Sequence, residues 1–178
     1  MLRRPTSRSL RETAKCGTVC GFTLIELMVT ISVMGVALAL AAPNFSQLIA
    51  NYRLRAAAES MLNGLNLARA EAVRRNTNVS FALNGAASDW TVATAGGTVI
   101  QSRVDSETGG LSATSSNSAT SITFLPTGLV YTTGGWLTRV TVSSSVTGTG
   151  TRQINVLGGG LIRMCDPAVS VINDPRRC

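Results

Sequence analysis

The chain has 178 residues with a formal net charge of +7, and it is 44% hydrophobic but only 4% aromatic. It contains no histidine, and the sequence offers no nucleophile–base pair, phosphate-binding loop or spaced carboxylate pair. We therefore expect neither an enzyme nor a protein that holds a metal or a cofactor.

The first 21 residues are basic, with five Lys or Arg residues against one Glu, a balance of +4. The remaining chain therefore carries only +3, and its charge does not indicate a broad nucleic-acid-binding surface. Basic flanks of apolar segments stay on the cytoplasmic side of a membrane, so we expect the rest of the chain to be exported. Cys16 and Cys20 in this region have a spacing that suits neither a zinc site nor a thioredoxin-type site.

Residues 22–42 form an apolar run in which Glu26 is the one charged residue. A helix of this length reaches about 31 Å at ~1.5 Å per residue, enough to cross a bilayer core of roughly 30 Å. A secretory signal peptide is the alternative, with residues 39–41 (Ala-Leu-Ala) as a cleavage-like triplet. The run is longer than an ordinary signal core, and an acid at the bilayer centre costs roughly 2.5–3.5 kcal/mol. We therefore expect Glu26 to have a partner.

The heptapeptide GFTLIEL at residues 21–27 resembles the processing motif of type IV pilins and pseudopilins. The resemblance implies that residues 1–21 are a leader, that a prepilin peptidase cuts between Gly21 and Phe22, and that Phe22 is N-methylated. It also implies that Glu26 pairs with the terminal amine of a neighbouring pilin or pseudopilin. The amine of Phe22 and the carboxylate of Glu26 lie one helical turn apart on the same face, so such groups can offset each other's desolvation.

Residues 43–76 are predicted to continue the helix as an amphipathic second half that ends near Asn76. Pro43 lacks an N–H and clashes with the preceding turn, so we predict a kink there. Apolar residues recur at helical spacing, and we expect this stripe to dock on the following domain while the interleaved arginines face solvent. The predicted stripe consists of Phe45, Leu48, Ile49, Tyr52, Ala56, Leu62, Leu65, Ala72 and Val73.

Residues 77–178 are predicted to form one β-rich globular head. Short apolar runs separated by Gly, Pro, Asn and Thr recur about every ten residues, which favours an antiparallel two-sheet arrangement. The Ser/Thr-rich stretch from Ser112 to Ser121 is interpreted as an exposed loop. The expected strands cover residues 79–83, 90–93, 99–101, 122–125, 129–131, 137–142, 153–157 and 161–164.

Four further segments are similar in order and spacing to the GspH/FimT subgroup of pseudopilins and minor pilins: residues 67–75, Trp90, residues 124–128 and residues 158–160. The resemblance implies an α+β fold, in which a long N-terminal helix has a transmembrane first half and packs its second half on a β-sandwich-like head. It implies a single-pass inner-membrane protein with a periplasmic head, which then assembles through its helix into a type IV pilus or its initiating tip complex. A GspH-type pseudopilin of type II protein secretion is the alternative.

The remaining two cysteines, Cys165 and Cys178, lie in the part that we expect to be exported. In an oxidising compartment a disulfide between them is the expected state. By the loop-entropy estimate it contributes up to ~3 kcal/mol, and it also ties down a tail with little other reason to be ordered.

The tail also offers a candidate DNA-binding site. Some FimT-type minor pilins bind DNA during natural transformation, and they are similar to one another in a Gly-Arg-x-Arg motif near the carboxyl end. Here residues 160–163 read Gly-Leu-Ile-Arg, so Arg163 fits the second arginine and Leu161 replaces the first. Arg176 and Arg177 could compensate if the disulfide folds them beside Arg163. Alternatively, Arg163 only flanks a last strand and the other two belong to a solvated tail.

Overall fold

The structure is a computed structural model that describes residues 21–85, 87–104 and 110–178. The predicted leader, with Cys16 and Cys20, lies outside the described residues except for Gly21. The chain divides into two compact units, Met1–Leu40 and Ala41–Cys178.

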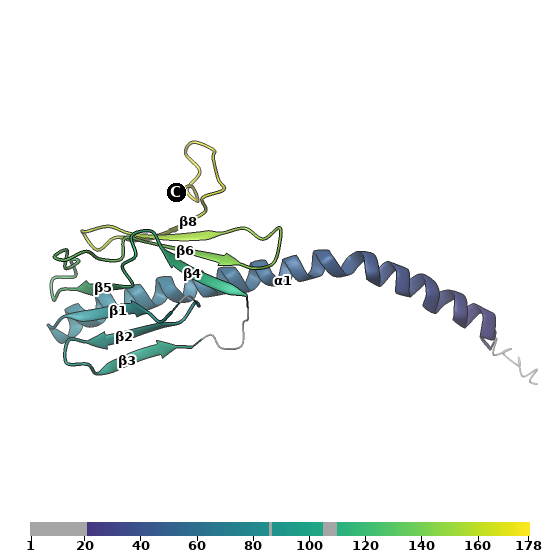
Figure 1. Cartoon of the computed structure of the whole chain (residues 1–178), viewed down its shortest axis with the longest axis horizontal. Coiled ribbons are helices and arrows are strands. Elements are labelled where there is room, and N and C mark those ends of the chain that lie inside the picture. The colour runs from purple at the N-terminus through teal and green to yellow at the C-terminus, as the bar shows by residue number, and fades with distance from the viewer. Residues whose placement is uncertain (1–20, 86, 105–109) are drawn as a thin grey trace, which may run out of the picture. The chain divides into compact units, whose positions relative to one another are not determined.

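A single long helix, α1, spans Leu24–Arg75 and contains 52 residues (Figure 1). Its C-terminus is closed by Asn76, which has a φ of 50° and donates its N–H to the carbonyl of Val73 at 3.3 Å. The next N–H, from Thr77, reaches the carbonyl of Ala72 at 3.2 Å. These two bonds form a Schellman motif, in which Asn is one of the few residues that tolerates the left-handed position. The predicted end of the helix near Asn76 agrees with this boundary.

The head unit carries its strands in two four-stranded sheets whose neighbours are all antiparallel. The first sheet has the order β3-β2-β1-β5 and the second β4-β6-β7-β8 (Figure 1). The prediction of an antiparallel two-sheet head on a long helix is therefore confirmed. The strands are β1 Val79–Leu83, β2 Trp90–Thr94, β3 Val99–Arg103, β4 Leu111–Ser115, β5 Ser121–Phe124, β6 Arg139–Ser144, β7 Arg152–Val156 and β8 Ile162–Cys165.

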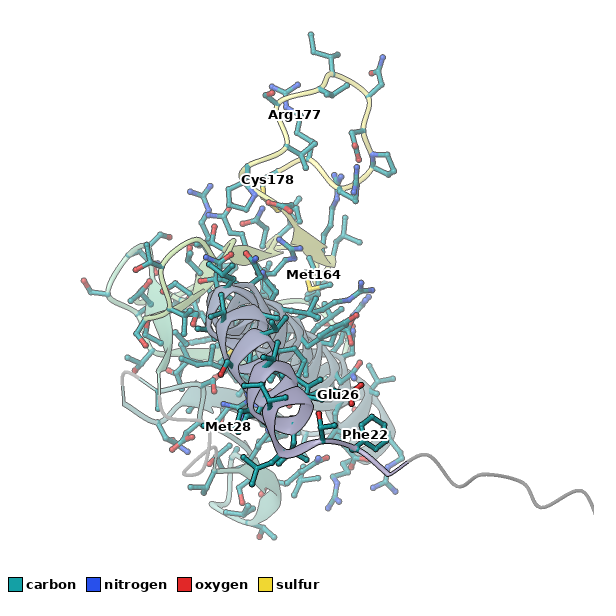
Figure 2. All side chains as sticks on the ribbon, turned by 90° about the vertical axis from the view of Figure 1, so that its right-hand side faces the viewer. Phe22, Glu26, Met28, Met164, Arg177 and Cys178 are labelled. Carbon is teal, nitrogen blue, oxygen red and sulfur yellow. A yellow bond between two sulfur atoms is a disulfide. The ribbon has the colours of Figure 1, made fainter. Side chains whose placement is uncertain are left out.

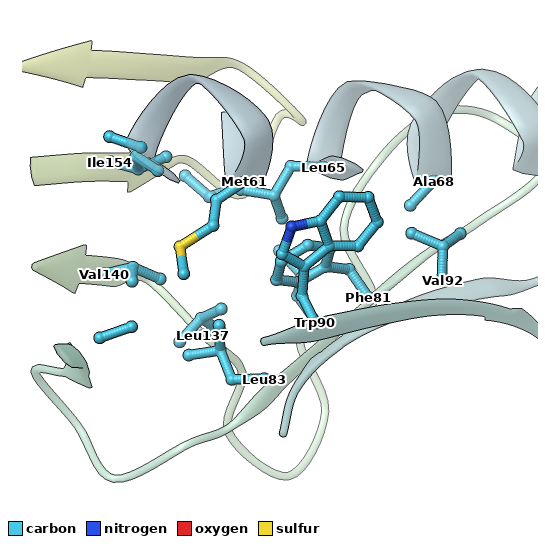
Figure 3. Close-up of a cluster of buried hydrophobic side chains, with 14 of the residues drawn as sticks. Met61, Leu65, Ala68, Phe81, Leu83, Trp90, Val92, Leu137, Val140 and Ile154 are labelled. Carbon is cyan, nitrogen blue, oxygen red and sulfur yellow. The ribbon is translucent and has the colours of Figure 1, made fainter. Parts of the chain in front are cut away.

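The core lies where α1 meets both sheets (Figure 3). Phe81 and Trp90 stack with their ring centroids 5.6 Å apart, and the Trp90 indole N–H donates to the Ser60 hydroxyl at 3.2 Å. A Cβ atom added at Gly64 would lie only 3.0 Å from both rings. Glycine at this position therefore lets two aromatic rings pack directly against the helix backbone, which a larger residue would prevent.

The predicted apolar stripe on the helix is largely wrong. Leu65 and Ala72 are buried as expected, but most of the other predicted members are exposed or only half-buried. The buried face is rich in alanine, and small side chains let the sheets approach the helix closely while adding little to its apparent hydrophobicity. The larger apolar residues lie on the opposite face of the helix, so their periodicity predicted the wrong face as the buried one. The buried helix residues are Ala50, Leu54, Ala57, Ala58, Met61, Gly64, Leu65, Ala68 and Ala72.

Two of the strand predictions also fail. Ser112–Ser121 is not simply a loop, because β4 occupies its first part, with Ala113 buried opposite Val142. The hydroxyls of Ser112 and Ser143 lie 2.8 Å apart, so pairing with β6 supplies partners that the polar sequence lacks locally. Residues 129–131 form no strand, and Val130 makes only an isolated bridge to Phe124.

Candidate functional site

The helix begins directly after the predicted cleavage bond. The Thr23 hydroxyl accepts the N–H of Glu26 at 3.2 Å, and the Thr23 carbonyl accepts the N–H of Leu27 at 3.1 Å. Thr23 is therefore the N-cap, and Glu26 occupies the third helical position of a Thr-x-x-Glu pattern. This cap was not predicted, although the Thr-x-x-Glu pattern at residues 23–26 signals it. A carboxylate here also faces the positive end of the helix dipole.

Phe22 and Glu26 are directed to the same side of the helix axis in the end-on view of Figure 2. Both side chains are exposed. The two side chains therefore share one surface at the start of the helix. Cleavage and methylation at Gly21 and Phe22 stay predictions.

All described residues of the first unit, 21–40, are exposed. A helix that is apolar around its whole circumference requires lipid or other helices to cover it. Neither α1 segment, Leu24–Leu40 or Asn44–Arg75, is long and apolar enough by itself to cross a membrane, but the two together meet the requirement by length and composition. The large apolar side chains exposed here are Phe22, Leu24, Ile25, Leu27, Met28, Val29, Ile31, Val33, Met34, Val36, Leu38 and Leu40.

Within the head unit, α1 has a second uncovered apolar surface opposite its core face. Phe45, Leu48 and Tyr52 are 64%, 50% and 66% exposed. These residues and the exposed Ala56 share one side of the helix by their spacing, and we call them the outer face. Further along the same side of the helix, the residue at position 63 is Asn and not an apolar residue. The outer face therefore ends within the head, after about three helical turns.

The glycine-rich segments that carry the family resemblance form two turns beside the end of α1. Gly128 and Gly160 have φ values of 78° and 77°, and an added Cβ at Gly160 would collide with the carbonyl oxygen of Gly128. Arg69 donates its Nε–H to that same carbonyl at 3.1 Å. Arg69 was predicted to face solvent, and it is exposed, but it also holds the turns against the helix. These motifs are therefore structural.

The predicted disulfide between Cys165 and Cys178 is present, with Cα atoms 5.0 Å apart. It closes a tail loop that projects beyond β8 in the head (Figures 1 and 2). The N–H of Asp166 donates to the carbonyl of Arg176 at 2.6 Å, and Asp166 forms a parallel bridge with Arg177. Backbone pairing and the disulfide therefore hold the last three residues beside the end of β8.

The three candidate DNA-binding arginines come from the same region but have different surroundings. Arg163 donates to the carbonyl oxygens of Pro175 at 2.7 Å and Arg177 at 3.1 Å, so it fastens the tail. Arg176 pairs with Asp174 at 2.8 Å, and this bond lowers the pKa of Asp174 to about 2. The guanidinium of Arg177 makes no ion pair with the described residues. The structure thus gathers the three residues, but two of them already have partners.

Comparison with known families gives two matches. Residues 57–160 match the family model described as type II transport protein GspH, which is more than half of the chain. Residues 18–42 match the prokaryotic N-terminal methylation motif, which includes the predicted cleavage position. No significant match was found among curated proteins.

Among solved structures, the fold is similar to that of FimU, a type IV minor pilin of Pseudomonas aeruginosa. The P21 crystal form has a TM-score of 0.53 and 19% identity, and the similarity covers 64% of this chain and 88% of FimU. A second crystal form, P65, has a TM-score of 0.47 and 24% identity over 62% of this chain and 91% of FimU. At these identities the P21 match supports the fold alone.

Proposed function

The chain belongs to the GspH family of type II transport proteins, and from this premise we propose that it is a membrane-anchored minor filament subunit. It is held in the inner membrane by α1 and then assembles through this helix with other pilins or pseudopilins. The preferred assembly is a type IV pilus or the tip complex that initiates it. Its role is structural, with interaction surfaces in place of catalytic groups.

The observation that carries this proposal is the uncovered apolar surface of α1. The first segment, residues 21–40, is exposed throughout, and the outer face of Phe45, Leu48, Tyr52 and Ala56 extends an apolar surface into the head. Lipid can cover the first segment, whereas contiguous apolar side chains on one helix face of the head are typical of a protein-binding surface. Neighbouring helices of the same kind would cover both surfaces in a filament.

Processing fits the same proposal. Cleavage between Gly21 and Phe22 would remove the basic residues ahead of the helix and place a cationic amine beside Glu26. The carboxylate of Glu26 then pairs with the amine of a neighbouring subunit, because both charges would otherwise be desolvated without a partner. This pair would set the axial register of one helix against the next.

Substitution on the outer face tests the assembly role. Leu48→Lys should reduce incorporation into sheared filaments by at least about tenfold, because a buried unpaired ammonium costs well over ~1.4 kcal/mol at a helix interface. Asn66→Lys is the matched control, since it adds the same charge to an exposed position beyond the apolar part of α1. Equal incorporation of Leu48→Lys and the parent chain, measured by immunoblot of filament fractions, would remove the proposal.

A type II secretion pseudopilus is the second candidate, favoured by the description of the matching family. Deleting the gene and scoring two phenotypes separates the two candidates. Loss of surface pili with normal protein export supports the pilus role, and loss of export with normal pili supports the secretion role. Expression of Leu48→Lys in the deletion strain should restore neither surface pili nor protein export.

A further inference from the structure

Strand β3 forms one edge of the first sheet, and no described strand pairs with its outer side. It pairs with β2 alone, and the backbone hydrogen bonds that described residues make outside helices and sheets do not involve Val99–Arg103. Alternate N–H and C=O groups of an edge strand point away from its neighbour. The natural complement of such a row is the backbone of another extended chain.

A groove of about 500 Å³ runs beside this edge, between β3 and α1. Gln101 and Arg103 pair with Val92 and Trp90, which point into the core, so their own side chains lie on the same helix-facing side of the sheet. Gln101 is nevertheless exposed and Arg103 is only half-buried, so these two side chains border the groove. The groove is lined by Ala56, Glu59, Ser60, Asn63, Gly64, Leu67, Trp90, Gln101 and Arg103.

We propose that the β3 edge and this groove together bind an extended, acidic segment of a partner protein by strand addition. The backbone of the segment pairs with β3, and its alternate side chains enter the groove. In this mode main-chain hydrogen bonds supply affinity and the pockets for alternate side chains supply specificity. The surface lies on the head and adjoins the outer face, with which it shares Ala56. Binding at the β3 edge can be measured on the unassembled chain.

The charged side chains that line the groove favour binding of an acidic peptide segment. Glu59 is held by Arg55 at 2.8 Å, so its charge is already compensated. Arg103 is half-buried and makes no ion pair with the described residues. A second copy of β3 contains no carboxylate and would bury Arg103 without a counter-ion, which is costly. A carboxylate on the added strand satisfies Arg103 with a charge-assisted hydrogen bond.

The test uses the full chain in detergent micelles and three synthetic nine-residue peptides. The first alternates Thr and Val around a central Glu, the second has Lys in place of Glu, and the third is the Glu peptide with alternate backbone amides N-methylated. Binding is measured by fluorescence anisotropy, and amide hydrogen exchange is followed at β3 and at β4, the terminal strand of the other sheet. We expect only the Glu peptide to bind and to slow exchange in β3, leaving β4 unchanged.

Substitution of the arginine provides the second arm. Arg103→Gln should weaken binding of the Glu peptide about tenfold, as expected for loss of one charge-assisted bond. Arg139→Gln is the matched control, since Arg139 is an exposed strand residue in β6 of the other sheet. The proposal is overturned by equal binding of the N-methylated peptide, by absence of β3 protection, or by an unchanged affinity of Arg103→Gln. Protection of β3 through self-association without peptide would assign the edge to a second copy instead.

Discussion

The first segment of α1 and the head solve the problem of apolar surface in opposite ways. Residues 24–40 are helical but bury none of their side chains against described parts of the chain, whereas the head encloses Phe81, Trp90 and their neighbours almost completely. The helix of the first segment follows from local sequence, and its stability must come from lipid or other subunits. The head supplies its own core. Mutations in the two regions should therefore have effects of different kinds.

The largest expected effect is on the head core. Phe81→Ala should lower the free energy of unfolding of the head by about 3–5 kcal/mol, since a large buried ring is lost and a cavity remains. Val36→Ala, in the first segment, should leave it unchanged. Urea unfolding of the full chain in detergent, followed by tryptophan fluorescence, measures both. Equal destabilisation by the two variants would break the contrast between the regions.

Removal of the disulfide should have the next largest effect. Cys178→Ser should cost up to ~3 kcal/mol by the loop-entropy estimate and should release the tail from β8. Arg163→Gln should have a smaller effect on the tail, because it removes two hydrogen bonds to tail carbonyls and leaves the disulfide in place. Amide exchange across residues 166–178 reports the release. Unchanged tail exchange in Cys178→Ser would show that backbone pairing holds the tail unaided.

In the first segment, Glu26→Ala should leave head stability unchanged but reduce filament incorporation about tenfold. Interhelical hydrogen bonds between polar side chains in membranes are worth ~1–2 kcal/mol in model peptides, and we expect a loss of similar size here. Glu26→Asp keeps the charge and should retain part of the incorporation. Immunoblots of membrane and filament fractions separate an assembly defect from a loss of protein. Normal assembly of Glu26→Ala would contradict the pairing role.

If the tail binds DNA, the existing side-chain partners of the tail arginines predict how much each arginine contributes to DNA affinity. Arg177 has no ion pair among described residues, so Arg177→Gln should lower DNA affinity a few-fold and reduce the salt slope by about one. Arg176→Gln should have a smaller effect, because Asp174 already compensates this charge. Filter binding at several salt concentrations measures both. Absence of salt-dependent binding by the parent chain would remove the DNA-binding role.

The smallest expected effect concerns Glu71 at the end of α1. Hydrogen bonds from Arg74 and then Arg75 lower the pKa of Glu71 from 4.5 to about 2. Because the pKa is lower in the folded state, the stabilisation is fully present above about pH 4.5 and is lost as the pH falls towards 2. Glu71→Gln should flatten this part of the pH dependence of the urea midpoint. An unchanged acid profile would show that these exposed pairs contribute nothing measurable.

The processing motif could be recognised in the sequence because all of its residues lie close together along the chain. Gly21, Phe22 and Glu26 lie within one short segment, and the methylation-motif match covers the same residues. Most strands and the approximate end of the helix near Asn76 were also predicted, because turn residues and alternation mark them. β4 was missed, since a Ser/Thr-rich strand owes its order to β6 and carries no signal of its own.

The long helix, the two-sheet head, the paired cysteines and the single acid in an apolar run all follow from local sequence patterns. Which side of α1 faces the core follows only from the packing of the helix against the two sheets. A face built of alanines is selected by how closely two sheets approach the helix, and that distance is a property of the packed head. The same packing leaves Phe45, Leu48 and Tyr52 exposed. Contacts within the tail give Arg163 and Arg176 their hydrogen-bond partners. The outer side of β3 is left without a described partner strand. These outcomes depend on contacts between segments far apart in the chain, so hydrophobic periodicity could not predict them.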